Sequence, residues 1–387
     1  MMLLLLLSVL LSLRAGATDF FVRPTGDDSL TGTSTNSSWR TIDRLNRTAF
    51  HPGDRILFEG GKSFSGNLRL TAEDSGATNA PVIIGSFGHD RATLLSGNAT
   101  GVTIESAGGI VMENLIISGA GLTNNSGYGI LCDNRRETGA RLEGLRIQNV
   151  EVSGFGIHGI LISGLQAGYR HVLVENCVMR DNLRGGMEIA GRLAYDSTNY
   201  AHADVRVTNC RAFNNTGDPN FTKNHSGSGI VVYQVDGGLI DHCAAWNNGA
   251  DGQNRGGGGV GIWTCASRKI VIQHCESFSN KTRGLDGGGF DIDGGSEDCV
   301  LQYNYSHDNF GPGLMVYTYA WAPHHDRGNI VRFNISENDS RKSRTYAGIW
   351  VRNDGNGMKG IEIYNNTVVM GEGCDQAAYV HGEGVEA

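Results

Sequence analysis

The chain has 387 residues, a formal net charge of −8 and no run rich in Lys or Arg. This balance argues against nucleic acid and acidic membrane surfaces as partners. With 57 glycines and only 6 prolines, the composition favours many short strands joined by tight turns over long helices.

The N-terminus carries a candidate targeting segment. An apolar run over residues 1–13 ends at Arg14 and is followed by Ala15-Gly16-Ala17. The run is too short to span a bilayer, and Ala-x-Ala is typical of a signal-peptidase site. We therefore expect residues 1–17 to be a signal peptide, and the mature protein to be soluble and secreted or periplasmic. No other apolar run approaches membrane length, so no membrane contact is expected.

Glycosylation stays open at this point. Twelve Asn-x-Ser/Thr sequons occur, among them Asn98, Asn220, Asn304 and Asn334. In a eukaryotic secreted protein several of them would carry glycans. Asn-rich turns followed by Ser or Thr would also generate such sequons without any modification.

Residues 18–100 precede a repeat that fills the rest of the chain. We expect them to form an N-terminal cap and the first coils, with a short helix over 41–46. The period is about 31 residues. One column of equivalent positions reads Cys177, Cys210, Cys243, Cys275, Asn304, Asn334 and Asn365. A second, five positions on, reads Asn182, Asn215, Asn248, Asn280 and Asn309.

The repeat predicts strands stacked coil upon coil. Within each unit, short β-branched stretches alternate and are separated by Asn and Gly. Strands of one coil can pair only with the same strands of the next coil, which predicts an all-β, single-stranded parallel solenoid. We expect about nine or more coils over 101–387. The stretch 378–381 is read as the last strand, and the C-terminal end is expected to be uncapped.

The cysteine column raises the question of disulfides. Equivalent residues in stacked strands lie about 4.8 Å apart, which is within disulfide range. Parallel side chains in a ladder need not point at one another, so a buried ladder of free thiols is the favoured interpretation.

These features resemble a known fold family. The ladder period, the Asn turns and the Gly-Ile/Phe-x-Ile strands over roughly 101–373 are similar to the right-handed parallel β-helix of the pectate lyase-like superfamily. The stretches 20–26, 39–42 and 52–58 resemble the start of secreted members, where a short helix covers the open end of the solenoid. The resemblance implies a carbohydrate-active protein. It does not choose among lyases, hydrolases, epimerases and adhesins, which share the fold.

One strand of each coil begins at a glycine, and its alternation predicts which residues face outward. The first and third residues after the glycine are almost all apolar and should face the core, so the second and fourth should face solvent. Acids and aromatics gather at the outward positions of the later coils, which indicates a substrate groove rather than an ordinary solvated face. The predicted substrate-binding residues are Glu188, Tyr233, Trp263, Tyr317, Trp350 and Arg352.

The segment 284–294 contains the candidate catalytic acids. Asp291 and Asp293 flank inward-facing Ile292, so their Cα atoms should lie about 6.5–7 Å apart. This spacing roughly matches the carboxylate separation of inverting glycosidases. Asp286 lies in the preceding bend and would complete a Ca²⁺ site if the loop folds back. Asp-Gly runs also make turns, which would account for Asp286 better than for Asp291.

Two insertions are expected to wall the groove. The first, 217–227, carries His225, and the second, 317–328, carries His324, His325 and Asp326. The His-His-Asp cluster would bind a metal, donate a proton or simply cover a flank.

Three functions remain open. The segment around Asp291 resembles the strand that carries the catalytic Lys of one pectate lyase family, but an Asp stands at the outward position, which counts against a lyase. The leading hypothesis is hydrolysis of a polysaccharide by Asp291 and Asp293, acting as acid and base, in a monomeric enzyme. The alternatives are a Ca²⁺-dependent lyase or epimerase, and a non-catalytic glycan-binding or adhesin solenoid.

Overall fold

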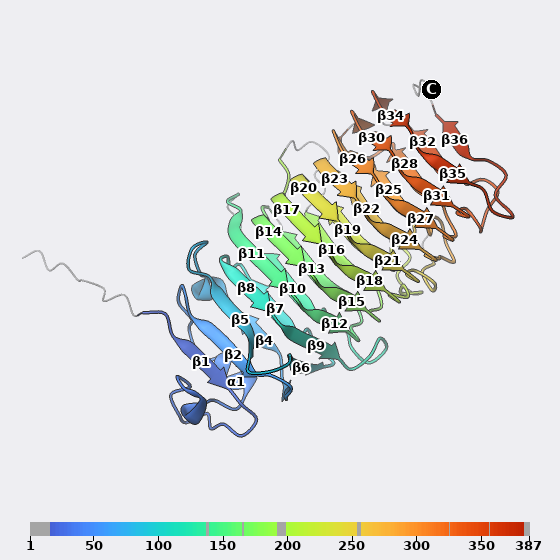
Figure 1. Ribbon diagram of the computed structural model, residues 1–387. Helices are drawn as coiled ribbons and strands as arrows, with labels where there is room; N and C mark the ends of the chain where they lie inside the picture. Colours follow the sequence, from blue (N-terminus) through green and yellow to red (C-terminus); the bar gives the residue numbers. More distant parts are fainter. Residues whose placement is uncertain are drawn as a thin grey trace, which may run out of the picture.

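The computed structural model describes residues 16–136, 139–164, 166–191, 199–253, 257–324, 326–355 and 357–382. Over these residues the chain winds into a parallel β-helix, as predicted (Figure 1). Three long parallel sheets run along the solenoid, and each coil contributes one strand to each sheet. The successive coils stack in sequence order from β1 at one end to β36 at the other (Figure 1).

The strands of the three sheets are as follows. Sheet A has twelve strands: β1 (Asp19–Val22), β2 (Arg55–Glu59), β5 (Val82–Phe87), β8 (Ile110–Glu113), β11 (Leu142–Gln148), β14 (Tyr169–Glu175), β17 (His202–Thr208), β20 (Val235–Asp241), β23 (Arg268–Gln273), β26 (Val300–Gln302), β30 (Ile330–Arg332) and β34 (Glu362–Tyr364). Sheet B has eleven: β3 (Ser63–Ser65), β6 (Ala92–Gly97), β9 (Leu115–Gly119), β12 (Glu151–Ser153), β15 (Val178–Arg180), β18 (Arg211–Phe213), β21 (Ala244–Trp246), β24 (Glu276–Phe278), β27 (Tyr305–His307), β31 (Ile335–Glu337) and β35 (Thr367–Val369).

Sheet C carries the predicted groove and also has eleven strands: β4 (Leu68–Leu70), β7 (Val102–Glu105), β10 (Ile130–Asn134), β13 (His158–Gly164), β16 (Gly185–Gly191), β19 (Ser228–Tyr233), β22 (Ile262–Cys265), β25 (Phe290–Asp293), β28 (Leu314–Tyr319), β32 (Ile349–Asp354) and β36 (Ala378–His381). A separate pair is formed by β29 (Asp326–Arg327) and β33 (Met358–Lys359).

The predicted short helix is present. Helix α1 (Ile42–Leu45) begins after Thr41, whose hydroxyl accepts a hydrogen bond from the Arg44 amide at 3.2 Å. Ile42 and Leu45 are buried against the first coils. Two 3₁₀ turns, Thr35–Ser37 and Ala72–Asp74, complete the helical structure of the described residues.

The glycine-led strands of sheet C have the predicted register. The first residue after each glycine pairs with its equivalent in the next coil and faces the core, because alternate side chains of a strand point to opposite faces. The pairs run through Ile130, Ile160, Met187, Ile230, Ile262, Phe290, Leu314 and Ile349. All but Ile349 are fully buried, and a single apolar core fills the solenoid.

The two polar columns are confirmed as scaffold, with one correction. In the asparagine column, each amide nitrogen donates to the side-chain oxygen at the equivalent position one coil on; Asn215 and Asn248 are joined at 2.9 Å, and the last member, Asn309, donates to Asp339 at 2.8 Å. In the other column, Asn334 bonds Asn366 at 3.0 Å, not the predicted Asn365. Asn365 instead takes the left-handed turn conformation before it, with φ 53°. The ladder position of this coil therefore lies one residue later than the repeat column predicts.

All eight cysteines are free and buried. Cys177 donates from its thiol to the carbonyl oxygens of Ile147 and Glu175, at 3.4 and 3.3 Å. The stacked thiols therefore bond to backbone rather than to one another, which confirms the predicted thiol ladder. No helix in the described part of the chain is long and apolar enough to cross a membrane. The predicted signal peptide falls almost entirely outside the described residues.

Candidate functional site

The outward face of sheet C is not simply solvated in its later coils. Side chains that point away from the core there pack into a second apolar cluster, which we call the outer cluster. Its buried members are Val231, Tyr233, Val260, Trp263, Cys265, Ala266, Met315, Tyr346, Ala347 and Trp350, with Tyr317, Tyr319 and Tyr379 partly buried against them. The outer cluster gives this face a low-dielectric environment, in which charges interact strongly.

The predicted catalytic acids lie in this environment. On β25, Asp291 is paired in register between Trp263 and Met315 and is only 2% exposed. Its Oδ1 atom has no hydrogen-bond partner. Asp293, two residues on, is partly exposed, and its Oδ1 accepts from the amide of Gly294 at 2.7 Å.

Asp286 lies on the bend that leads into β25. It takes the left-handed conformation, with φ 58°, and the residue is partly exposed. The Oδ2 atom accepts from the amide of Gly258 at 2.6 Å, and its own amide donates to the hydroxyl of Tyr346 at 3.0 Å. Asp286 and Asp293 therefore each accept a hydrogen bond from a backbone N–H with one carboxylate oxygen. The other oxygen of each has no backbone donor among the described residues.

Burial raises the pKa of all three acids, and repulsion from neighbouring carboxylates adds to the shift at Asp291 and Asp293. Desolvation is the main cause in each case. It raises the pKa of Asp293 to about 8, with further repulsion from Asp286 and Asp326. The pKa of Asp291 lies well above its usual range, because Asp293, Asp286 and Asp326 add to its desolvation. The pKa of Asp286 is also raised, but the Gly258 amide and the Lys342 ammonium oppose the shift.

Most of the predicted aromatic contacts turn out to be packing. Trp263 is 4% exposed, Trp350 6% and Tyr233 9%. The insertion 217–227 covers two of them, since the His225 ring lies 4.8 Å from Trp263 and 5.6 Å from Tyr233. The rings of Trp263 and Tyr233 are therefore covered by other residues of the protein. The strand alternation predicts that these side chains point outward. It does not predict that an insertion covers them.

The most exposed ring near Asp293 comes from outside the predicted set. Trp321 is 58% exposed, and its ring centroid lies 4.1 Å from that of Tyr319. The Tyr319 hydroxyl lies 3.4 Å from the thiol of Cys265, so Tyr319 extends across the adjacent coils. Tyr319 also packs on Gly294, where a Cβ atom would lie 2.6 Å from the ring. The absence of a side chain at Gly294 lets the ring approach next to Asp293.

A polar group lies beyond these rings. Arg352 and Tyr317, both predicted as substrate contacts, are register partners joined through Asp354. Arg352 donates from Nε to Asp354 Oδ1 at 2.7 Å, and the Tyr317 hydroxyl donates to Oδ2 at 3.0 Å. The strand pattern does not predict Asp354 as a site residue, because Asp354 lies beyond the second and fourth positions after the glycine that begins this strand.

Glu188 has an imidazole partner that the sequence did not suggest. On adjacent strands of sheet C, His158 Nε2 lies 3.2 Å from Glu188 Oε2. Desolvation raises the pKa of Glu188 to about 7 and lowers that of His158 to about 3. His158 also stacks on Tyr128, with ring centroids 6.2 Å apart. The pair is thus a largely buried, weakly charged polar group, and Glu188 lies three strands from Asp291.

The described residues of the predicted His-His-Asp cluster in the second insertion make structural contacts. Asp326 is fully buried and accepts from the amides of Gly295 and Ser296 at 3.1 and 3.2 Å. His324 packs against the ring of Tyr200. His325 lies outside the described residues. Asp326 therefore supports the turn after β25, and the predicted His-His-Asp cluster, which includes His325, stays a prediction.

The predicted Ca²⁺ site is not formed by this arrangement. Among the described residues, the one group of three His, Cys, Asp or Glu side chains whose ligand atoms lie within 4.8 Å of one another is Asp241, His242 and His274. Asp286, Asp291 and Asp293 do not converge in this way. Their raised pKa values fit acid and base chemistry better than a preformed cation site.

Comparison with known proteins supports the fold. A lacto-N-biosidase of Bifidobacterium longum subsp. longum is 22% identical over 451 residues, which cover 92% of this chain and 27% of that protein. The crystal structure of the GH136 lacto-N-biosidase from Eubacterium ramulus has a TM-score of 0.68 at 16% identity, covering 91% of this chain and 68% of that chain. The A-module of the mannuronan C-5 epimerase AlgE4 from Azotobacter vinelandii gives 0.52 at 17% identity, covering 86% and 90%.

The chain thus spans about a quarter of the length of its curated relative, and its likeness to the solved structures concerns the fold. The family model described as the right-handed β-helix region matches residues 128–324, about half of the chain. These residues include the asparagine column from Asn182 to Asn309, the four ladder cysteines, and the bend and strand that carry the three acids. The chain belongs to the right-handed β-helix family.

Proposed function

We propose that the protein hydrolyses a glycosidic bond of an oligosaccharide or polysaccharide on the outer face of sheet C, using Asp286 and Asp293. The observation that carries this proposal is the pair of partly exposed residues Asp286 and Asp293 near a buried third acid, Asp291, on the sheet face that also carries the outer cluster. The similarity to lacto-N-biosidases supports a glycoside as the substrate class.

Asp293 suits the role of general acid. Its raised pKa of about 8 keeps the carboxyl group protonated at neutral pH. It would transfer that proton to the glycosidic oxygen as the bond to the anomeric carbon breaks. Gly294, the residue after Asp293, has no side chain, so the Tyr319 ring packs against it. The ring would therefore border the path by which a substrate reaches Asp293.

Asp286 suits the role of the ionised partner. The Lys342 ammonium and the Gly258 amide both favour its charged form. It would activate water, or attack the anomeric carbon, on the face opposite Asp293. Both routes consume one water and release two sugars. The stereochemistry of the product distinguishes them, because a base leads to inversion and a nucleophile to retention.

Asp291 is assigned a supporting role, which revises the pairing expected from sequence. At 2% exposure it has little surface for a substrate to contact. Its raised pKa keeps it neutral, so it does not compete with Asp286 for the single negative charge that the site can hold. Catalysis by Asp291 with Asp293 is the alternative that mutagenesis decides.

The substrate would extend along sheet C. Trp321 and Tyr319 offer ring surface beside Asp293, and the Arg352–Asp354–Tyr317 group offers polar contacts beyond them. Glu188 lies three strand spacings from Asp291 in the other direction, a distance of about 14 Å. A groove of this length suits more than one sugar unit.

The test is a panel of oligosaccharides and polysaccharides incubated with wild-type protein, Asp286→Asn, Asp291→Asn and Asp293→Asn, with products identified by mass spectrometry. Cleavage by hydrolysis that is lost in Asp286→Asn and Asp293→Asn supports the proposal. Unsaturated uronide products would replace it with a lyase. Binding of a glycan without any cleavage would favour the non-catalytic solenoid.

A further inference from the structure

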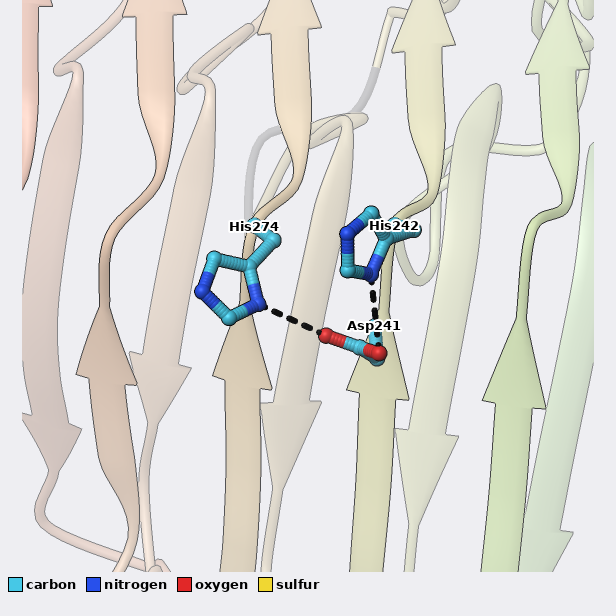
Figure 2. Close-up of side chains that lie close together, drawn as sticks. All are labelled: Asp241, His242 and His274. Carbon is cyan, nitrogen blue, oxygen red and sulfur yellow. Dashed lines mark hydrogen bonds and ion pairs between the residues drawn. The ribbon is translucent and has the colours of Figure 1, made fainter.

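We propose that Asp241, His242 and His274 form a binding site for a divalent transition-metal ion such as Zn²⁺. The three residues lie at the end of β20 and the end of β23 in sheet A, where the chain turns toward sheet B (Figure 2). Asp286, Asp291 and Asp293 are carried instead by sheet C and the bend before it. The metal site is therefore independent of the proposed hydrolysis.

The side chains already converge on one point. His242 Nδ1 lies 2.9 Å from Asp241 Oδ2, and His274 Nδ1 lies 3.0 Å from Asp241 Oδ1, so both imidazoles turn the same nitrogen to one carboxylate (Figure 2). One ligand atom from each residue lies within 4.8 Å of the others. Ligands of a tetrahedral Zn²⁺ lie about 3.3 Å apart, given metal–ligand bonds of about 2.0–2.2 Å. Small side-chain rotations are enough to admit the ion.

The turn geometry explains why two imidazoles meet here. His242 and His274 are the left-handed residues that end equivalent strands of adjacent coils, with φ 52° and 51°. Stacked coils bring such residues within one strand spacing, about 4.8 Å, and the two ring centroids are 4.9 Å apart. The same turn position in the other coils from β8 onward holds Asn114, Asn149, Asn176, Asn209, Tyr303, Phe333 and Asn365. Among these described turns, paired imidazoles beside a carboxylate occur at this one place.

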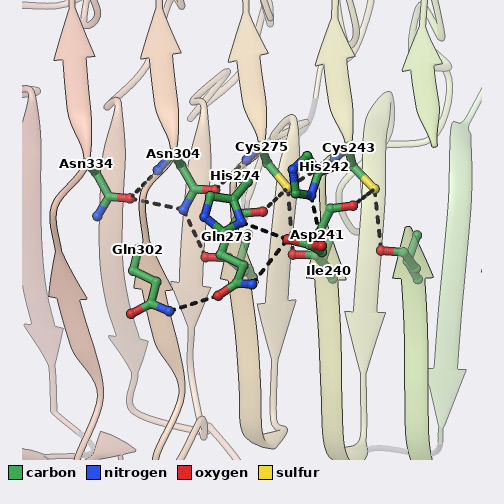
Figure 3. A network of polar contacts seen from close by, with 12 residues as sticks. Ile240, Asp241, His242, Cys243, Gln273, His274, Cys275, Gln302, Asn304 and Asn334 are labelled. Atoms are coloured by element: carbon green, nitrogen blue, oxygen red, sulfur yellow. Dashed lines mark hydrogen bonds and ion pairs between the residues drawn. The ribbon is translucent and has the colours of Figure 1, made fainter. Parts of the chain in front are cut away.

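The backbone and the carboxylate are both held in position. The residue after each histidine is a ladder cysteine, and the amide of Cys243 donates to the sulfur of Cys275 at 3.4 Å (Figure 3). On the strand side, Gln273 donates from Nε2 to Asp241 Oδ1 at 3.2 Å. Gln302 in turn donates to Gln273 at 2.8 Å. Such support keeps ligands preorganised and tunes a metal site.

The ligand set selects the kind of ion. Two neutral imidazoles and a carboxylate suit Zn²⁺, Cu²⁺ or Ni²⁺, whereas Ca²⁺ and Mg²⁺ prefer oxygen ligands alone. The His242 and His274 side chains are 59% and 44% exposed, so the remaining coordination positions are open to water. A bound ion would link two successive coils and would stabilise the folded chain by mass action.

The experiment is isothermal titration of untagged, EDTA-treated protein with ZnCl₂, with thermal unfolding recorded in parallel. The compared proteins are the wild type, His242→Ala, His274→Ala and the matched control His171→Ala. His171 is also a left-handed, exposed histidine that bonds a carboxylate, Glu143, at 2.8 Å, but it has no second imidazole beside it in the described structure.

We expect one Zn²⁺ per chain, a higher Tm with Zn²⁺ and no such effect with Ca²⁺. His242→Ala and His274→Ala should each weaken binding about tenfold or more and abolish the Tm shift, while His171→Ala should behave as wild type. The proposal is overturned if wild-type protein shows no saturable binding at about 1 mM Zn²⁺, or if both variants bind as tightly as wild type. Glycosidase activity, where present, should be unchanged in these variants.

Discussion

Trp263 on β22 and Asp291 on β25 are register partners on the outer face of sheet C, and they are only 4% and 2% exposed. A buried carboxyl group thus lies beside an indole on the side of the sheet that faces away from the core. At this point the outer face of sheet C is buried and apolar, as a protein core is. This burial accounts for the raised pKa values of the acids around it, since a low-dielectric environment disfavours their charged forms.

The first prediction concerns the catalytic pair. Asp286→Asn and Asp293→Asn should each lower kcat by about 100- to 10,000-fold, because each removes the acid or base while keeping the size of the side chain. The measurement is initial rates on a glycan that the wild type cleaves. Asp204→Asn on sheet A, whose side chain is 52% exposed, is the matched control and should keep full activity. Full loss of cleavage in Asp291→Asn, with Asp286→Asn active, would move the pair to Asp291 and Asp293.

The second prediction is the alkaline limit of activity. If Asp293 must be protonated to act as the acid, kcat should fall as pH rises through about 8. The pH profile of kcat on the same substrate measures this limit. A rate that stays constant up to pH 10 would exclude Asp293 as the general acid.

The third prediction is the pH dependence of stability. The folded-state pKa of Asp293, about 8, exceeds the unfolded value of 3.8, so the folded state holds the proton more tightly. This contribution to the free energy of unfolding is full below pH 3.8 and is lost as pH rises toward 8. Asp293→Asn should therefore raise Tm at pH 8 by several °C but not at pH 4, since about 1 kcal/mol corresponds to roughly 2–4 °C in a chain of about 150–250 residues and to somewhat less in a longer one.

Calorimetry of the two proteins at both pH values makes the comparison. Asp204→Asn again serves as control, because its exposed side chain on sheet A should leave the difference between the two pH values unchanged. Equal Tm changes for Asp293→Asn at pH 4 and pH 8 would contradict the raised pKa.

The fourth prediction concerns the asparagine ladder. Asn248→Ala should lower the free energy of unfolding by about 2–4 kcal/mol, because buried partners would be left without hydrogen bonds. The Asn248 amide donates to Ala212 and Asn280 at 3.0 Å, and its oxygen accepts from Asn215 at 2.9 Å. Denaturant unfolding measures the change. The exposed Asn79→Ala is the control; an equal loss there would show that the ladder bonds contribute nothing particular.

The scaffold could be predicted from the sequence because the same pattern of residues recurs in coil after coil. The register of sheet C could be counted from Gly129 to Gly348, and the thiol and amide columns marked positions where only small or hydrogen-bonding side chains stack. The site was harder to predict, because coverage depends on insertions that do not repeat. His225, brought onto Trp263 by an insertion, turned an expected sugar platform into packing. His158 and Glu188 lie on adjacent strands of sheet C but at different register positions, and the sequence of neither coil alone indicates their contact.

The fifth prediction tests the substrate surface that replaced the expected one. Trp321 is 58% exposed and lies against Tyr319, which packs on Gly294 beside Asp293. Trp321→Ala should raise KM about five- to tenfold with little change in kcat, since a ring contact of about 1–1.5 kcal/mol would be lost equally from the ground and transition states. The control is Phe333→Ala, which removes a ring of 38% exposure at a sheet A turn. A fall in kcat with KM unchanged would instead assign Trp321 to the transition state, and no change in either constant would remove it from the groove.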